Sequence, residues 1–232
     1  MKKEISTTSW DATLDTRKCD KYNNAELTIK MKLAFKKINP ANNDKIGCFD
    51  DSNNIGRQIN SWTPSQWASW KSSFTKSVEE YWSGKFWLVN NFGLFPYSYK
   101  YHLQNINKFI EEEYIPNIWC RFKLDVRDAE FSKDHHHTIK VVKLDPSERF
   151  FRSHSRLYTN TDIKTKVTDY DSCGDEIFFQ THLHEVGHLL GLEHVDVGKP
   201  HCPEDSNTNL SPCYGVDDED KYSVMGLSLI HI

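Results

Sequence analysis

The feature that most constrains this chain is residues 184–194, which read His-Glu-Val-Gly-His-Leu-Leu-Gly-Leu-Glu-His. His184 and His188 are four residues apart, so on an α-helix both imidazoles project from the same face and can bind one metal ion. Gly191 lets the backbone leave the helix, because a residue without a Cβ adopts a positive φ at small cost. The turn that follows brings His194 back as a third nitrogen ligand.

Glu185 follows the first histidine directly and lies close enough to accept a proton from a water molecule held at the metal. Three neutral imidazoles and one water complete the tetrahedral geometry of catalytic zinc, which keeps one position open for chemistry. The alternative is a core helix with incidental histidines, but it would leave polar rings without partners among the leucines of the same segment. The segment therefore predicts a zinc site with Glu185 as its general base.

The extended motif resembles that of the metzincin zinc metallopeptidases, whose name refers to a methionine-containing turn beneath the metal. Tyr222-Ser223-Val224-Met225-Gly226 supplies a matching methionine downstream of His194. The resemblance covers residues 184–226 and implies an α+β, metzincin-like domain. Such a domain has a twisted mixed sheet, an active-site helix that carries the zinc motif, and a Met-turn with Met225 packed under the ligands. Plain core filling is the alternative role of Met225.

The resemblance also implies an activity, that of a zinc-dependent endopeptidase acting on a protein or peptide substrate. Its zinc ligands would be His184, His188 and His194. Two alternatives remain open: a zinc hydrolase acting on another amide, such as a cell-wall peptide, and a domain that retains zinc only to bind a partner. Glu185 argues against the second, because a structural site has no use for a base. Some metzincins carry a tyrosine two residues after the methionine that binds zinc or the oxyanion; here that position is Leu227.

Alternation of apolar and polar residues predicts strands with one buried face at 27–36, 118–126 and 138–144. A further strand is predicted at 85–92. Residues 40–61 are rich in Asn, Asp and Gly, and we expect a long loop there.

Thr63-Pro64-Ser65-Gln66 has the form of a capping box with proline at the first helical position. Apolar residues follow at three- and four-residue steps and predict an amphipathic helix to about Trp82. Its aromatic residues are expected to pack in the core, with a ligand platform as the alternative. The stripe consists of Trp67, Trp70, Phe74, Val78 and Tyr81.

The zinc helix is predicted to begin near residues 172–175, where Ser and Asp can cap free amides, and to end at about Leu190. In the metzincins, an edge strand ahead of this helix binds extended substrate by main-chain pairing. Residues 138–144 and 154–159 are the two candidates for that strand.

A length of 232 residues suits one catalytic domain over 1–232, with about 1–25 as a polar N-terminal extension. The net charge of −4 argues against nucleic acid or an anionic membrane as the main partner. No apolar run approaches the length of a membrane span, and we expect a monomer. The start of the chain lacks a signal-peptide core. The resemblance to the metzincins implies a protein that is secreted or delivered outside the producing cell.

Six cysteines, an even number, do not by themselves fix a disulfide connectivity. They are Cys19, Cys48, Cys120, Cys173, Cys202 and Cys213. The last two share the loop between His194 and Met225, where a bridge would stiffen the floor of the substrate cleft. Reduced, unpaired thiols are the alternative.

Three other polar clusters are expected to be solvated rather than to bind a metal ion. His135–His137 is expected to be a solvated loop, because consecutive residues of an extended chain point to opposite faces; a second metal is the alternative. Asp217–Asp220 and the Asn/Asp-rich segment 42–54 are expected to be solvated turns, with Ca²⁺ binding as the alternative, since neither has the spacing of a calcium loop.

Three residues close to the motif are not expected to bind the metal. His182 lies two residues before His184, so the helix turns it away. His201 follows His194 too far along the loop, and Glu193 is expected at the surface, with support of a ligand as its alternative role.

Overall fold

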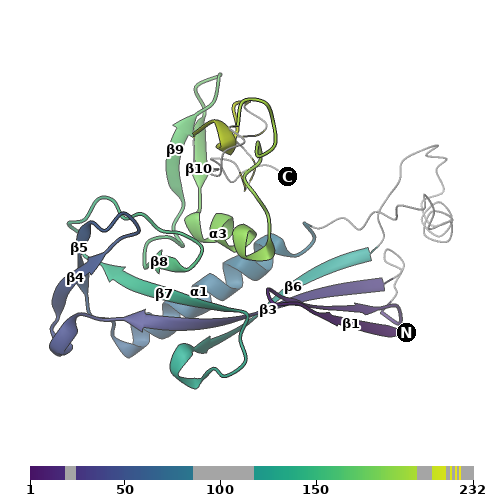
Figure 1. Cartoon of the computed structure of the whole chain (residues 1–232), viewed down its shortest axis with the longest axis horizontal. Helices are drawn as coiled ribbons and strands as arrows, with labels where there is room; N and C mark the ends of the chain where they lie inside the picture. Colours follow the sequence, from purple (N-terminus) through teal and green to yellow (C-terminus); the bar gives the residue numbers. More distant parts are fainter. Residues whose placement is uncertain are drawn as a thin grey trace. The chain divides into compact units, whose positions relative to one another are not determined.

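The computed structural model describes residues 1–18, 25–85, 118–202, 211–217, 220, 223 and 225 (Figure 1). The chain divides into two compact units. The first comprises Met1–Lys32 and Glu79–Asp125, and the second comprises Leu33–Val78 and Val126–Ile232. Three elements contribute residues to both units, namely β3 (Ala25–Ile38), α1 (Pro64–Trp82) and β6 (Ile118–Asp128).

In the first unit, β1 (Lys2–Ser6) and β2 (Asp11–Asp15) form an antiparallel hairpin. The Thr7 hydroxyl closes its turn, because Oγ1 accepts from the backbone N–H of Trp10 at 3.0 Å and donates to its carbonyl at 2.7 Å. β2 pairs antiparallel with the beginning of β3, and β6 also pairs with β3. The segment expected to be a polar extension therefore contains a β-hairpin.

The second unit is organised around β7 (His137–Leu144), which pairs in parallel with β3 from Leu33 opposite His137 to Ile38 opposite Val142. β7 also pairs in parallel with β8 (Leu157–Thr159) and antiparallel with β5 (Gly56–Asn60). β4 (Ile46–Asp50) completes this sheet by pairing antiparallel with β5. The prediction of an α+β fold with a mixed sheet is confirmed at this level.

The expected long loop over residues 40–61 is wrong, because β4 and β5 form a hairpin within it. Asp51 closes the turn: its Oδ1 accepts from the backbone N–H groups of Asn53 at 2.9 Å and Ile55 at 3.2 Å. Asn54 takes a positive φ of 59°, which asparagine tolerates better than most residues. The polar residues here build a tight turn instead of a long connection.

The capping box at the start of α1 is confirmed. The backbone N–H of Gln66 donates to Thr63 Oγ1, and the backbone N–H of Thr63 donates to Gln66 Oε1, both at 3.3 Å. The helix ends at Trp82, as the spacing of apolar residues predicts.

Four residues of the stripe on α1 are buried in the core of the second unit, as expected: Trp67, Trp70, Phe74 and Val78. Tyr81 is half-buried and belongs to the first unit. Phe35 of β3 is fully buried, and its ring meets the edges of Trp70 at 5.3 Å and Phe74 at 5.1 Å between centroids. Tyr158 of β8 packs on the other side of Phe74 at 5.6 Å. This cluster fastens α1 to the strands that lead to the zinc motif.

The predicted strands at 27–36, 118–126 and 138–144 are confirmed as β3, β6 and β7. The strand predicted at 85–92 lies outside the described residues except for Lys85. Short 3₁₀ helices occupy Ala41–Asn43, Ala129–Phe131 and Ser211–Tyr214. No helix within the described part of the chain is long and apolar enough to cross a membrane.

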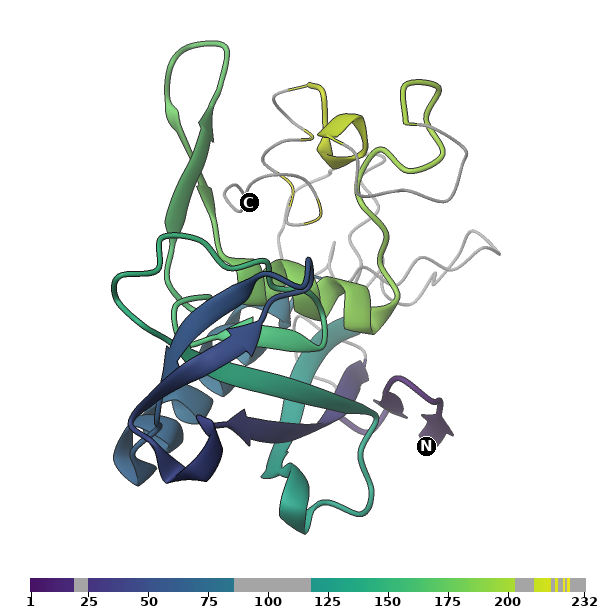
Figure 2. The same cartoon turned by 60° about the vertical axis from the view of Figure 1, so that its left-hand side comes forward.

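The helix that carries the zinc motif begins later than predicted. β9 (Lys166–Tyr170) and β10 (Glu176–Phe179) form a separate two-stranded sheet, and α3 (Thr181–Leu190) follows at once (Figures 1 and 2). Asp171 Oδ1 accepts the backbone N–H groups of Cys173 and Asp175 and so closes the hairpin. The start predicted at 172–175 is wrong because the residues that cap helices also close turns.

Candidate metal centre and active site

α3 buries one face formed by Leu183, Val186 and Leu189. The helix stops at Gly191, which has a φ of 94°. Its N–H donates to the His188 carbonyl, and the N–H of Leu192 reaches the Gly187 carbonyl, both at 3.0 Å. The left-handed conformation of Gly191 reverses the chain direction after His184 and His188 and directs the chain toward His194.

The structure brings the three predicted ligands together. The Nε2 atom of His188 lies 3.1 Å from that of His184 and 3.0 Å from that of His194. Zinc–nitrogen bonds of about 2.0–2.1 Å at tetrahedral angles would place two ligand nitrogens about 3.4 Å apart, so the spacing fits a common metal ion. His184, His188 and His194 can therefore hold a metal ion. Within the described ranges, this is the group of histidine, cysteine and carboxylate side chains that converges in this way.

The ligand rings are held in a form suited to metal binding. His188 Nδ1 donates to the Leu192 carbonyl at 2.9 Å, which leaves Nε2 as the acceptor that faces the other two histidines. Burial lowers the pKa of His188, so the neutral ring is favoured. His184 and His194 are buried as well, with 3% and 5% of their surface exposed.

Glu185 lies beside this group on α3. Burial first, and the negative charge of Asp162 second, raise the pKa of Glu185 to about 8. A divalent cation at the three histidines acts in the opposite direction, because it stabilises the carboxylate. The same surroundings raise the pKa of the fully buried Tyr158, through burial first and then through the charges of Glu185 and Asp162. Glu185 is thus a carboxyl group in a largely dry site next to the candidate ligands.

Asp162 is a residue that sequence reasoning missed. Its Oδ2 accepts from the Ser153 hydroxyl at 2.5 Å and from the Thr159 N–H at 2.7 Å, and Lys166 Nζ contacts Oδ1 at 3.1 Å. The residue is 2% exposed. It ties β8 to the loop that precedes β9 and sets the charge near Glu185. Asp162 stands outside any motif, so nothing in the sequence signals this position.

His182 points away from the candidate ligands, as the helical spacing predicts. Its Nδ1 donates to the Asp162 carbonyl at 3.0 Å, which requires Nε2 to accept from the Ser77 hydroxyl at 2.6 Å. Phe74 packs against the ring at 5.5 Å. These contacts fasten α3 to the part of α1 that belongs to the same unit.

Met225 is 6% exposed. Its carbonyl accepts from the N–H of Val195 at 3.2 Å, and its own N–H donates to Ser223 Oγ at 3.3 Å. The methionine is therefore tied through its backbone to the residue that follows His194. Tyr222, Val224 and Gly226 of the predicted Met-turn, and Leu227, lie outside the described residues.

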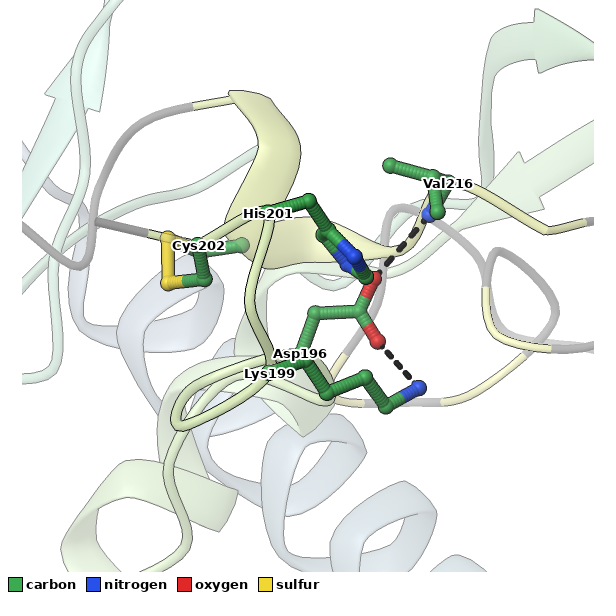
Figure 3. Close-up of a disulfide and its surroundings, with 6 residues drawn as sticks. Asp196, Lys199, His201, Cys202 and Val216 are labelled. Atoms are coloured by element: carbon green, nitrogen blue, oxygen red, sulfur yellow. Dashed lines mark hydrogen bonds and ion pairs between the residues drawn. A yellow bond between two sulfur atoms is a disulfide. The ribbon is translucent and has the colours of Figure 1, made fainter. Parts of the chain in front are cut away.

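The loop after His194 also contains the predicted disulfide. Cys202 and Cys213 are bonded, with their Cα atoms 4.8 Å apart (Figure 3). Of the other cysteines, Cys48 and Cys173 are exposed free thiols and Cys120 is a buried one, whose pKa burial raises to about 11. Cys19 lies outside the described residues.

Tyr214 is a second residue that the sequence did not indicate. Its ring centroid lies 3.8 Å from that of His194 and 5.9 Å from that of His184. Burial raises its pKa, with the charge of Glu185 as the next cause. The residue follows Cys213 directly, so the disulfide brings it to the site.

The other predicted positions are not part of the converging group of three histidines. His135 is exposed, but His137 is buried at the start of β7, so the expected solvated loop is wrong for that residue. β7, the strand that the alternation predicts at 138–144, begins one residue earlier and includes His137. Glu193 is exposed, as expected, and His201 bonds Asp196 at 2.7 Å.

The acidic residues considered as alternative calcium ligands either bond protein groups or are exposed. Asp51 is committed to its own turn and to Arg57, and Asp217 is exposed. Asp220 pairs with Lys199 at 2.6 Å. Asp218 and Glu219 lie outside the described residues.

Of the two candidate edge strands for substrate, residues 138–144 are excluded, because β7 pairs with β3, β5 and β8. Residues 154–159 contain β8, whose one strand partner among the described residues is β7. The backbone of Leu157 exchanges hydrogen bonds with His154, and the N–H of Thr159 donates to Asp162 Oδ2 at 2.7 Å. The second edge of β8 is therefore already occupied at these residues.

No family model, no curated protein and no solved structure matches this chain. The chemistry of the site is thus the basis for any assignment of function.

Proposed function

We propose that this protein is a zinc-dependent endopeptidase of the metzincin type that acts on protein or peptide substrates. The observation that carries the proposal is the convergence of the Nε2 atoms of His184 and His194 on that of His188, at 3.1 and 3.0 Å. The half-buried Glu185 lies next to His184 in α3. Neutral imidazoles are ligands that zinc prefers, and three of them leave a fourth position for chemistry. A glutamate beside the first ligand is the base that such a site uses.

Zinc, when bound, would lower the pKa of water and polarise a substrate carbonyl. The Glu185 carboxylate accepts a proton from the attacking water, and the protonated carboxyl then donates it to the amine that leaves. Both steps need a group whose pKa lies near the working pH. Burial raises the pKa of Glu185, whereas a nearby cation would lower it.

The disulfide between Cys202 and Cys213 supports a location outside the reducing interior of the producing cell. We therefore propose that the enzyme is secreted or delivered, and that it works as a monomer.

The test compares the zinc-loaded wild type with Glu185→Gln. Each protein is incubated with a mixed protein and peptide library, and new peptide termini are mapped by mass spectrometry. We expect termini with the wild type and a loss of about 10²–10⁴-fold in rate for the variant, because the proton acceptor is gone. Zinc content should be equal in both. Glu130→Gln, an exposed glutamate on another element, is the matched control and should cleave like the wild type.

Equal cleavage by Glu185→Gln would overturn the assignment of the base. A wild type that holds zinc and yields no new termini would favour an amide substrate of another kind, or a domain that binds a partner.

A further inference from the structure

The loop that follows His194 is fastened to the site at several points. The N–H of Val195 donates to the Met225 carbonyl at 3.2 Å, and the N–H of Asp196 donates to the Cys213 carbonyl at 3.1 Å. The disulfide from Cys202 to Cys213 adds a covalent connection to the same place. The chain leaving the third ligand is thus held beside residues 213–216 and Met225.

Asp196 is the centre of these connections (Figure 3). It is fully buried, and its carboxylate contacts Lys199 Nζ at 2.5 Å and His201 Nε2 at 2.7 Å. The N–H of Val216 donates to the same carboxylate at 3.1 Å. A buried charge needs such partners. Here two of them, Lys199 and His201, come from the segment before Cys202, and the third, Val216, comes from the segment after Cys213. Asp196 therefore fixes the backbone just after the segment Cys213–Tyr214.

Tyr214 lies between two fixed points, Cys213 before it and Val216 after it. Gly215, with a φ of 108°, lets the chain turn so that the N–H of Val216 can reach Asp196. The Tyr214 ring lies over the His194 ring at 3.8 Å between centroids, with 34° between the planes. A ring held at both backbone ends is a rigid surface for the imidazole to pack against.

His194 differs from the other two candidate ligands in its position outside the helix. His184 and His188 project from α3, whose backbone fixes their spacing, and the Leu192 carbonyl also orients His188. His194 lies beyond the end of the helix, so its ring plane depends on the loop around it. Groups that orient a metal ligand from behind commonly set the metal affinity.

We propose that Tyr214 is a positioning residue that holds the His194 ring in the orientation for metal binding, and that the Cys202–Cys213 disulfide sets the metal affinity by holding Tyr214 there. The inference rests on the proposed function only in requiring that the three histidines bind zinc. It makes metal retention depend on whether these two cysteines are bonded.

The first test measures the zinc affinity of the full-length, metal-free protein by competition with a chromogenic chelator. Tyr214→Leu should weaken binding by about 10–100-fold, the usual cost of losing a group that orients a ligand. Tyr214→Phe keeps the ring and should restore affinity to within a few fold of the wild type. The Co²⁺ absorption spectrum should change for Tyr214→Leu and not for Tyr214→Phe. An affinity for Tyr214→Leu equal to that of the wild type would overturn the inference.

The second test removes the bridge by substitution, so that no reductant competes for zinc. Cys202→Ser/Cys213→Ser should lose affinity to a similar degree, and adding Tyr214→Leu should cost little more, because both changes act on the same ring. The matched control, Cys48→Ser/Cys173→Ser, removes two exposed free thiols and should bind zinc like the wild type. Full additivity of the two losses, or no loss on removing the bridge, would overturn the role of the disulfide.

These results separate the inference from the proposed function. A wild type that binds no zinc would contradict both. A wild type that binds zinc and cleaves substrate, together with Tyr214→Leu of equal affinity, would contradict the inference alone.

Discussion

His182 and Glu185 lie three residues apart on α3, and burial shifts the pKa of each toward its neutral form. The pKa of His182 falls to about 4, while the pKa of Glu185 rises to about 8. A neutral His182 can accept from Ser77 and donate to the Asp162 carbonyl at the same time, which a charged ring cannot. His182 therefore fastens the helix, whereas Glu185 is the base in the proposed function.

The lowered pKa of His182 predicts a pH dependence of stability. In the unfolded chain His182 takes up a proton near pH 6.5, and in the folded protein only near pH 4. The unfolded state thus binds more protons between these values, and the free energy of unfolding falls as the pH drops from about 6.5 to about 4. The contribution of His182 is at most about 3 kcal/mol.

Urea unfolding of the metal-free protein across this pH range measures the effect. His182→Gln should be less stable than the wild type at pH 7, and its stability should vary less between pH 6.5 and 4. His135→Gln, an exposed histidine, serves as the control and should follow the wild type. A profile for His182→Gln parallel to that of the wild type would refute the assignment.

At the scale of elements, sequence patterns predicted those that are long and periodic. β3, β6 and β7 alternate apolar and polar residues along the sequence, although Leu33–Phe35 of β3 and Val141–Val142 of β7 are buried in succession. α1 repeats its apolar residues at helical spacing behind a capping box. The β4–β5 hairpin was not predicted, because its strands are short and its turn is built from Asp51 and its neighbours. Such residues suit a loop or a turn equally well by composition.

The start of α3 was predicted too early for a related reason. The Asp171 carboxylate satisfies backbone N–H groups in a hairpin turn, whereas the helix begins after Gln180 with no side-chain cap. Competition between a cap and a turn is decided by the strands on either side, which the local sequence does not specify.

The capping box of α1 yields a prediction at this scale. Thr63→Ala removes the acceptor for the Gln66 N–H and should lower the free energy of unfolding by about 1 kcal/mol. Thr63→Ser keeps a hydroxyl and should recover most of the loss. Urea unfolding of the three proteins at one pH measures both values. Equal losses for Ala and Ser would show that the hydroxyl does not cap the helix.

At the scale of the molecule, the motif at 184–194 predicted the residues that converge, because its spacing is local to one helix and one turn. The residues around that group come from distant segments: Ser77 from α1, Asp162 from the loop after β8, and Tyr214 from the disulfide-bonded loop. Their roles follow from tertiary packing, which places residues more than 100 positions apart in contact. No pattern in the sequence contains that information.

Zinc K-edge X-ray absorption on the zinc-loaded protein tests the proposed three-histidine site. We expect one zinc per chain with three imidazole nitrogens and one further light-atom ligand at about 2.0–2.1 Å. His188→Ala should lose that signal, since His188 Nε2 lies within 3.1 Å of both partners. Sulfur ligands, or an unchanged spectrum in His188→Ala, would contradict a zinc site formed by these histidines.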